Sequence, residues 1–256
     1  MNKRVRLLGC PLDLLSQAQL LDRVAQAVDD GKRLRIEGLN VAKLVDARCD
    51  DALLSALEEA EVVHVDGMGI SLGLACLGRR AAERVAGIDL MQTLCADAAR
   101  RGASVYLLGA RPEVVAQAAV HLREAHPGLQ ISGARDGYFA VEDEPEVVAD
   151  IRASGAELLF IGISSPKKER FLREHWQALG VSIGMGVGGS FDVISGLLPR
   201  APLWMQRCGL EWLFHLLLEP RRLAGRYLRT NLVFFWLLLR ARLRRSNGLV
   251  GESLQP

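Results

Sequence analysis

Several common functional signatures are missing from this chain of 256 residues. Its five cysteines are scattered, odd in number and include no Cys-x-x-Cys pair, which argues against a disulfide framework or a zinc site and fits a reducing compartment. The five histidines show no metal-ligand spacing, and no Asp-x-Asp follows an apolar run, so we expect no metal ion and no cofactor. A P-loop and a serine nucleophile elbow are absent too.

Long apolar runs are also missing. No run reaches the roughly 18 residues needed to span a bilayer, and the nearest is 232–239, LVFFWLLL, between Arg229 and Arg240. This run fits either a buried core helix or a helix lying on a membrane, and its basic flanks favour the second. The N-terminal stretch starts basic, but Pro11 and Asp13 interrupt it before signal-peptide length, so we expect a cytoplasmic protein.

What the chain does have is a C-terminal segment rich in arginine and aromatic residues. From Arg200 onward there are ten arginines and three glutamates, a net +7 in a chain whose total is +2. Arginines interleaved with Trp, Phe and Leu on helices are typical of surfaces that bind anionic lipid head groups. We therefore predict an α/β body over 1–199 and a basic helical appendage over 200–256 that docks on an anionic membrane surface.

The body alternates short apolar runs with amphipathic segments. The predicted strands are Val5–Leu8, Leu34–Gly38, Val62–Val65, Ser104–Leu108, Leu129–Ser132, Leu158–Ile161 and Val181–Met185. The predicted helices are Ser16–Asp29, Asp51–Ala60, Asp89–Arg101, Pro112–Ala125, Pro145–Ala153 and Pro166–Leu179. Continuous apolar strands alternating with helices predict an open, doubly wound, Rossmann-like fold with a mostly parallel sheet. Ligands of such sheets bind beyond the carboxyl ends of the strands.

The clearest candidate at a strand end is Asp66, which directly follows Val62–Val65 in a glycine turn. A carboxylate placed there points into the ligand crevice and is suited to act as a general base that accepts a hydroxyl proton. The alternative is a structural role, in which Asp66 only caps a helix starting near Ile70.

Three other strand ends carry weaker signals. The turn at Gly109 leads into a helix whose N–H groups favour phosphate, although the turn itself is not GxGxxG. Ser164–Lys168 is either a diphosphate cradle or an ordinary first helical turn. Gly186–Asp192 contains three glycines, which indicates close approach either of a ligand or of another loop.

Taken in order, these segments resemble the WecG/TagA/CpsF family of bacterial glycosyltransferases over roughly 34–227. The segments that carry the resemblance are GLNVAKL, VDGMG, RVAGID, YLLGARPE, PGL followed by GYF, IGISSPKKE, GVGGSFD, RAPLW, GLEWL and EPRRL. The resemblance implies an inverting, metal-independent enzyme on the inner face of the cytoplasmic membrane, able to self-associate. Its donor would be a UDP-sugar, and its acceptor a polyprenyl-diphosphate-linked sugar on the route to a cell-surface polysaccharide.

The resemblance also implies roles for individual residues. Asp66 would be the general base. Arginines of the C-terminal segment would fold over the site and neutralise the leaving UDP, and other residues would bind substrate. The arginines are Arg221, Arg222 and Arg226. The substrate-binding residues would be Asn40 and Arg84 beside the base, Gly109, Ser164 and Lys168 at the diphosphate, and Tyr138, Gly189 and Asp192 toward the nucleoside.

Two positions depart from the family pattern. Gly38 stands where the family usually has Thr, and Lys168 stands where it usually has Gln. Because both positions lie near the donor in the family, we expect a hexose or N-acetylhexosamine donor for exopolysaccharide synthesis. The alternative is N-acetylmannosamine or its uronic acid, as in teichoic acid or common antigen synthesis.

Two other classes of function remain open from the residues alone. One is a nicotinamide- or nucleotide-dependent α/β enzyme, which the membrane-type tail disfavours. The other is a non-catalytic protein whose basic tail binds nucleic acid or lipid. The apolar run LVFFWLLL suits acyl chains better than a DNA groove, so we expect no nucleic-acid partner.

Overall fold

The computed structural model describes residues 4–79 and 83–246, with the backbone alone at residues 222 and 244–246. The strands are β1 (Arg4–Leu7), β2 (Cys10–Asp13), β3 (Leu34–Leu39), β4 (Val62–Val65), β5 (Ser104–Gly109), β6 (Gln130–Arg135), β7 (Leu158–Gly162) and β8 (Ile183–Gly186). Six of them form one sheet in the order β4-β3-β8-β7-β5-β6, and every neighbouring pair is parallel. The predicted open α/β sheet is confirmed.

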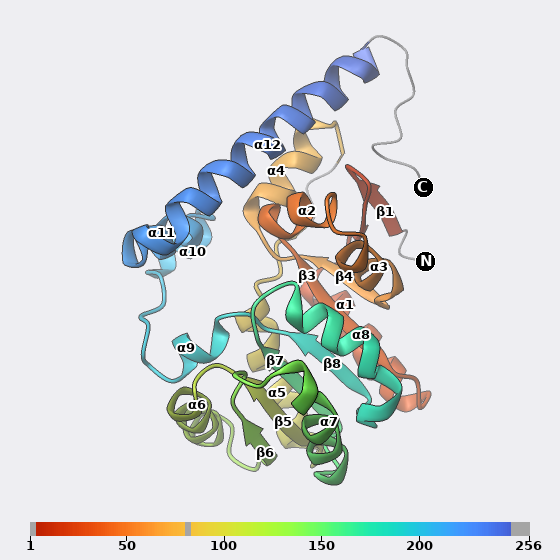
Figure 1. The fold of residues 1–256 in the computed structure, drawn as a ribbon, viewed down its shortest axis with the longest axis vertical. Coiled ribbons are helices and arrows are strands. Elements are labelled where there is room, and N and C mark those ends of the chain that lie inside the picture. Colours follow the sequence, from red (N-terminus) through yellow and green to blue (C-terminus); the bar gives the residue numbers. More distant parts are fainter. Residues whose placement is uncertain (1–3, 80–82, 247–256) are drawn as a thin grey trace.

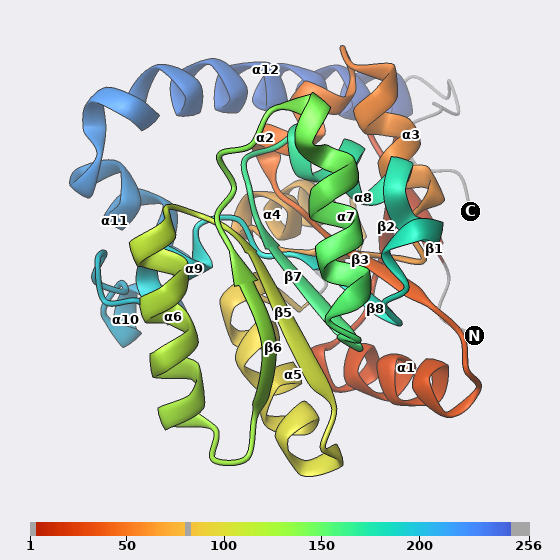
Figure 2. The ribbon, with the colours of Figure 1, turned by 60° about the horizontal axis from the view of Figure 1, so that its bottom comes forward.

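Helices cover both faces of this sheet. In the body they are α1 (Gln17–Asp29), α2 (Val41–Ala47), α3 (Asp51–Glu59), α4 (Met68–Cys76), α5 (Gly87–Arg101), α6 (Pro112–Ala125), α7 (Glu144–Ala153), α8 (Lys167–Leu179) and α9 (Ser190–Ile194), with a 3-10 turn at Val141–Asp143. Helices α1, α5 and α6 share one buried cluster with the sheet, whereas α7 and α8 share another on the opposite face. Figure 2 shows α5 and α7 on opposite sides of β5 and β7.

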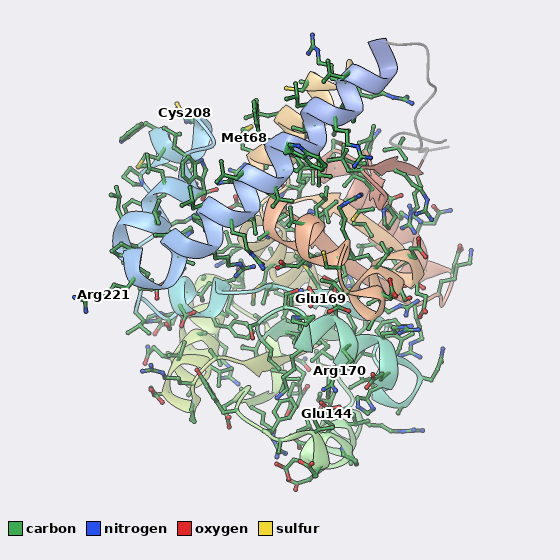
Figure 3. The ribbon with its side chains drawn as sticks, turned by 45° about the horizontal axis from the view of Figure 1, so that its top comes forward. Met68, Glu144, Glu169, Arg170, Cys208 and Arg221 are labelled. Carbon is green, nitrogen blue, oxygen red and sulfur yellow. The ribbon has the colours of Figure 1, made fainter. Side chains whose placement is uncertain are left out.

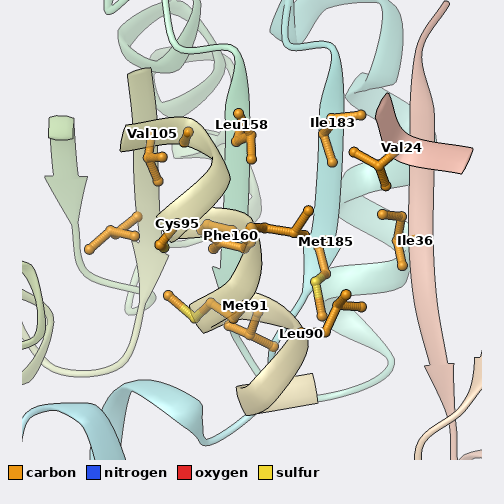
Figure 4. Close-up of a cluster of buried hydrophobic side chains, with 14 of the residues drawn as sticks. Val24, Ile36, Leu90, Met91, Cys95, Val105, Leu158, Phe160, Ile183 and Met185 are labelled. Carbon is orange, nitrogen blue, oxygen red and sulfur yellow. The ribbon is translucent and has the colours of Figure 1, made fainter. Parts of the chain in front are cut away.

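The central strands β5 and β7 are buried on both faces because successive side chains alternate between two apolar layers. On β5, Val105 and Leu107 face the α5 side, and Tyr106 and Leu108 face the α7–α8 side. Figure 4 shows the first layer, where side chains of α5 including Met91 lie across the central strands. This double burial explains why the strands are continuous apolar runs.

The N-terminal strand departs from the prediction. Val5–Leu8 was expected to join the sheet, but β1 pairs antiparallel with β2 in a separate two-stranded sheet. The turn between them places Leu8 and Gly9 at positive φ, as a tight hairpin requires. Arg4 also holds Asp13 across the hairpin at 2.8 Å. A four-residue apolar run cannot distinguish these two kinds of pairing.

Three helices follow the body: α10 (Leu203–Arg207), α11 (Glu211–Leu218) and α12 (Pro220–Ser246). Helix α12 lies across α4 and α2 at the end of the molecule opposite α6 and α7 (Figure 1). Phe234 anchors it, because its ring fills the space beside Gly73, where an added Cβ would come within 2.7 Å of the ring. Among the described residues, no helix combines the length and apolar composition needed to cross a bilayer.

Only part of the apolar run 232–239 is buried, as expected for a core helix, and the rest is exposed. Phe234 is 7% exposed and joins the core, whereas Phe235 and Trp236 are 68% and 54% exposed. Apart from Val233, the exposed large apolar side chains of α12 recur every three or four residues and so share one helix face. We call them the α12 apolar stripe: Leu228, Leu232, Phe235, Trp236, Leu239 and Leu243.

Candidate active site

Asn40 and Asp66 follow two neighbouring parallel strands, β3 and β4. Asn40 caps α2, and its side-chain oxygen accepts a hydrogen bond from the N–H of Lys43 at 3.0 Å. It lies against Gly67, where an added Cβ would come within 3.2 Å of the Asn40 Cβ. The structure thus brings Asn40 beside the turn that carries Asp66.

The half-buried Asp66 carboxylate is held by the start of α5. Its Oδ1 accepts a hydrogen bond from the N–H of Gly87 at 3.1 Å. The N-cap position of α4 is Gly67, and no side chain caps that helix, so the alternative role predicted for Asp66 is not seen. The second carboxylate oxygen, Oδ2, accepts no hydrogen bond from any described residue. Asp66 therefore presents one oriented and one available oxygen at the carboxyl edge of the sheet.

Backbone turns meet where β5, β6 and β7 end. Helices α6 and α8 leave the neighbouring strands β5 and β7 toward opposite faces, and ligands of open α/β sheets commonly bind at such a point. Gly109 has φ +139°, and an added Cβ would come within 2.5 Å of the Gly162 backbone. The N–H of Ala110 already donates to the Gly162 carbonyl at 3.1 Å. Gly109 thus allows the ends of β5 and β7 to approach closely, and this role does not depend on a ligand.

The predicted diphosphate and nucleoside residues lie on loops around this edge. Ser164 is exposed, and Tyr138 is 75% exposed on the loop after β6. Lys167 joins the two loops: its ammonium donates to the Phe139 carbonyl at 2.5 Å and lies 4.0 Å from the centre of the Phe139 ring. Pro166 was predicted as the first residue of α8 but occupies its N-cap. The structure therefore places Ser164 and Tyr138 on one solvent-facing rim.

Lys168 does not lie on that rim. Its ammonium is buried in a quartet of side chains, Glu37, Lys43, Lys168 and Glu169, each at most 6% exposed. Lys43 contacts Glu37 at 2.9 Å and Glu169 at 2.8 Å, and Lys168 contacts Glu37 at 3.1 Å and also Glu169. Two positive and two negative charges balance. In this structure Lys168 pairs with protein carboxylates.

The quartet shifts the ionisation of its members. Burial opposes the charge on Glu169, but Lys168 and Lys43 outweigh it and hold the pKa of the Glu169 carboxyl well below its ordinary value. Burial likewise opposes the charge on Lys43, yet Glu37 and Glu169 raise its pKa above the ordinary lysine value. Glu169 and Lys43 are therefore charged near neutral pH. The ion pairs of the quartet tie α2 and α8 to β3.

Arg84 and Arg200 connect the Asp66 region to the C-terminal helices. Arg84 was predicted to line the substrate pocket, but its guanidinium forms an ion pair with Glu211 on α11 and donates to the Gln206 carbonyl at 3.3 Å. Arg200 contacts Asp89 on α5 at 2.6 Å. Neither contact was predicted, because each joins residues more than a hundred positions apart.

The arginines predicted to cover the site lie at the start of α12. Arg221 and Arg226 are exposed, and Figure 3 shows Arg221 pointing outward from the turn between α11 and α12. The backbone of Arg222 lies in the same helical turn, and its side chain lies outside the described residues. In this structure Arg221 does not contact Asp66.

The nucleoside-side residues Gly189 and Asp192 lie at the start of α9. Sequence reasoning missed that Gly184, Gly186 and Gly189 have GxGxxG spacing. The structure gives the first two glycines a packing role: an added Cβ at Gly184 would press on side chains of α8, and one at Gly186 would meet the ammonium of Lys168 at 2.6 Å. The helix that follows has only five residues.

His64 lies on β4, two residues before Asp66, and is fully buried. Neither ring nitrogen lies within hydrogen-bond distance of a partner in the described chain. Burial lowers the pKa of His64, and Asp66 only partly opposes this. The folded protein therefore keeps the imidazole neutral, whereas the unfolded chain protonates it near the ordinary value of 6.5. Stability from this residue is present above that value and is lost as pH falls toward the folded pKa.

His64→Leu is expected to leave the free energy of unfolding at pH 7.5 unchanged or raise it by about 1–2 kcal/mol, because it removes an unsatisfied buried polar group. When pH falls from 6.5 to 5.5, the wild type should lose up to about 1.4 kcal/mol more of its free energy of unfolding than His64→Leu does. Urea unfolding at both pH values measures these effects. Equal pH dependence in the two proteins would contradict the assignment of a neutral imidazole.

One group of potential metal ligands occurs among the described residues. Glu144, Glu174 and His175 place ligand atoms within 4.8 Å of one another on α7 and α8. Glu144 is already bound by Arg170 at 2.7 Å and by His175 at 2.9 Å. Figure 3 shows Glu144 and Arg170 at the end of the molecule far from Met68, which follows the Asp66 turn. This group is not part of the candidate active site.

Comparison with protein families agrees with this arrangement. A family model described as the glycosyl transferase WecG/TagA/CpsF family matches residues 5–248, nearly the whole chain. The match spans the parallel sheet, the Asp66 turn and the C-terminal helices together. The chain therefore belongs to the WecG/TagA/CpsF family of glycosyltransferases.

Proposed function

We propose that this glycosyltransferase moves a hexose or an N-acetylhexosamine from a UDP-sugar to a hydroxyl group of a polyprenyl-diphosphate-linked sugar, without a metal ion and with inversion. The observation that carries this proposal is the Asp66 carboxylate. One oxygen is held by Gly87 and the other is available at the carboxyl edge of the sheet. A single oriented carboxylate of this kind suits removal of a proton from an alcohol.

The proposed reaction is a single displacement at the anomeric carbon. The acceptor O–H bond breaks and its proton moves to the free oxygen of Asp66, while the acceptor oxygen bonds to the anomeric carbon. The bond between that carbon and the diphosphate oxygen breaks on the opposite face, so the configuration inverts. UDP leaves with the electron pair, and its negative charge requires cations in place of a metal. Arg221, Arg222 and Arg226 are the proposed cations.

In this proposal the arginines reach the site only when the enzyme docks on the inner face of the cytoplasmic membrane. Arg221 points outward in the structure, so the start of α12 must move to deliver it. The α12 apolar stripe provides a driving force, since its large side chains are exposed beside Arg226 and Arg240. Docking and completion of the site would then be one event, with 1–199 and 200–256 acting as separate functional parts.

A double change of the stripe, Phe235→Ser with Trp236→Ser, is expected to weaken binding to vesicles of anionic phospholipid at least tenfold. Each exposed aromatic side chain contributes on the order of 1.5–3 kcal/mol when it leaves water. Vesicle co-sedimentation measures the binding. Val120→Ser, an exposed apolar position on α6, is the control and should bind like the wild type. Wild-type binding by the double variant would overturn the membrane proposal.

The proposed donor rests on Gly38 and Lys168, the two positions at which this sequence departs from the family pattern near the donor. At Gly38 an added Cβ would come within 2.9 Å of the Asp66 Cβ, so a larger residue would press on the base. Lys168 balances Glu37 and Glu169. Transfer rates from UDP-glucose, UDP-N-acetylmannosamine and its uronic acid to a short polyprenyl-diphosphate-sugar test the donor. We propose a role in exopolysaccharide synthesis, and preference for the N-acetylmannosamine or uronic acid donor would instead favour the alternative, teichoic acid or common antigen synthesis.

A further inference from the structure

The backbone from Val85 to Gly87 determines where the Asp66 carboxylate points. The N–H of Val85 donates to the Val65 carbonyl at 2.8 Å, which continues the edge of β4 by one bond. The N–H of Gly87 then donates to Asp66 Oδ1 at 3.1 Å. Any displacement of this short segment is transmitted directly to the proposed base.

The C-terminal helices hold the same segment from its other side. Arg84 forms an ion pair with Glu211, and Asp89 pairs with Arg200 at 2.6 Å. Met68, two residues after Asp66, fills the space over Gly209, where an added Cβ would come within 2.6 Å of its side chain. We call these three contacts the 84–89 seam.

The Arg84–Glu211 pair is the more shielded of the two ion pairs in the seam. Its side chains are 18% and 16% exposed, against 33% and 41% for Arg200 and Asp89. Arg84 also donates to the Gln206 carbonyl at 3.3 Å, so its guanidinium contacts both α10 and α11. Because partly buried charges are less screened by water, this pair should hold the segment most firmly.

We infer that Glu211 is a positioning residue for Asp66, acting through Arg84 and the 84–89 seam. This inference rests on the proposed function of Asp66 as the base. It gives the C-terminal segment a second task besides membrane docking, because α11 fixes the orientation of the base even when no membrane is present. Glu211 itself touches neither substrate nor the reacting atoms in this assignment.

Glu211→Gln tests this inference on a water-soluble short-chain acceptor with anionic phospholipid vesicles in excess, so that every protein is docked to the same extent. Misplacement of a reacting group by about 1 Å costs roughly a hundredfold in rate, so we expect kcat to fall about tenfold or more. The KM for the UDP-sugar should stay within about twofold. Exchanging the charges, Arg84→Glu with Glu211→Arg, should recover part of kcat. Hydrogen exchange at the 84–89 backbone should become faster in Glu211→Gln.

The matched control is Asp46→Asn. Asp46 on α2 pairs with Arg229 on α12 at 2.8 Å, so it also joins the body to the C-terminal helices, but it lies outside the seam. This variant should keep wild-type kcat and wild-type exchange at 84–89. If the wild type is active and Glu211→Gln has the same kcat and the same hydrogen exchange at 84–89, the inference about Glu211 is wrong. The proposed function of Asp66 is not affected by that result. If the wild type transfers no sugar from any donor, the proposed function fails, and with it the assignment of Asp66 as the residue being positioned.

Discussion

Lys168→Met is expected to lower the free energy of unfolding by about 3–5 kcal/mol. Removing one partner of a buried ion pair has this effect because it leaves a buried charge uncompensated. Without Lys168, the carboxylates of Glu37 and Glu169 share the single ammonium of Lys43. Domains of ordinary stability have only about 5–15 kcal/mol in total, so the change should be plain in urea unfolding at pH 7.

Two further variants separate charge balance from loss of a side chain. Lys168→Met with Glu37→Gln removes one charge of each sign, leaves the pair between Lys43 and Glu169 intact, and should recover part of the loss. Lys32→Met breaks an exposed pair with Asp30 and should change stability by less than about 1 kcal/mol. The account of the quartet is wrong if Lys168→Met behaves like Lys32→Met.

The same quartet should make the protein sensitive to acid. Because the pKa of Glu169 is lowered in the folded state, the unfolded chain binds a proton at this residue before the folded protein does. The contribution of Glu169 to stability is complete above pH 4.5, the ordinary pKa of a glutamate carboxyl, and is lost as pH falls below that value. Lys168→Met should weaken this dependence, since Lys168 is the largest of the effects that favour the charged carboxylate.

Asp66→Asn is expected to reduce kcat for sugar transfer by about 10²–10⁴-fold, the usual contribution of a general base. The amide keeps the shape of the side chain, and its oxygen can still accept the hydrogen bond of Gly87. It cannot take the proton of the acceptor hydroxyl. The KM for the UDP-sugar should change little, because the base contacts the acceptor and not the nucleotide in the proposed step.

Stability and membrane binding serve as controls for this variant. Unfolding in urea and co-sedimentation with anionic vesicles should match the wild type, because both depend on parts of the molecule that Asp66→Asn leaves unchanged. A slow rate together with normal folding and docking assigns the loss to chemistry. Full activity of Asp66→Asn would remove Asp66 from the proposed step.

The sequence predicted the elements of the sheet well because their signals are local. Val62–Val65 and Pro112–Ala125 have the same bounds in the structure as in the prediction. Each combines a mostly apolar or a periodic pattern with a clear boundary residue. Helix α2 was not predicted, because seven residues are too few to establish a helical period.

The surroundings of the site residues could not be predicted, because they depend on distant pairs. Lys168 meets Glu37 across 131 positions, and Arg84 meets Glu211 across 127. The sequence, through the strand-end position of Lys168 and the family resemblance at Arg84, placed both basic residues where substrate was expected. It could not show that protein carboxylates from other elements already neutralise them. The position of Asp66 at the end of β4 was predictable because it depends only on its own strand and turn, whereas its hydrogen bond with Gly87 was not predicted.

Asp66 is proposed to act as the general base of sugar transfer, with no divalent ion. The most direct measurement is the rate of transfer from the preferred UDP-sugar to a short polyprenyl-diphosphate-sugar in excess EDTA, for the wild type and Asp66→Asn side by side. The account predicts that the wild type keeps its full rate in EDTA and that the variant is slower by at least a hundredfold. Loss of wild-type transfer in EDTA, or equal rates for the two proteins, would contradict it.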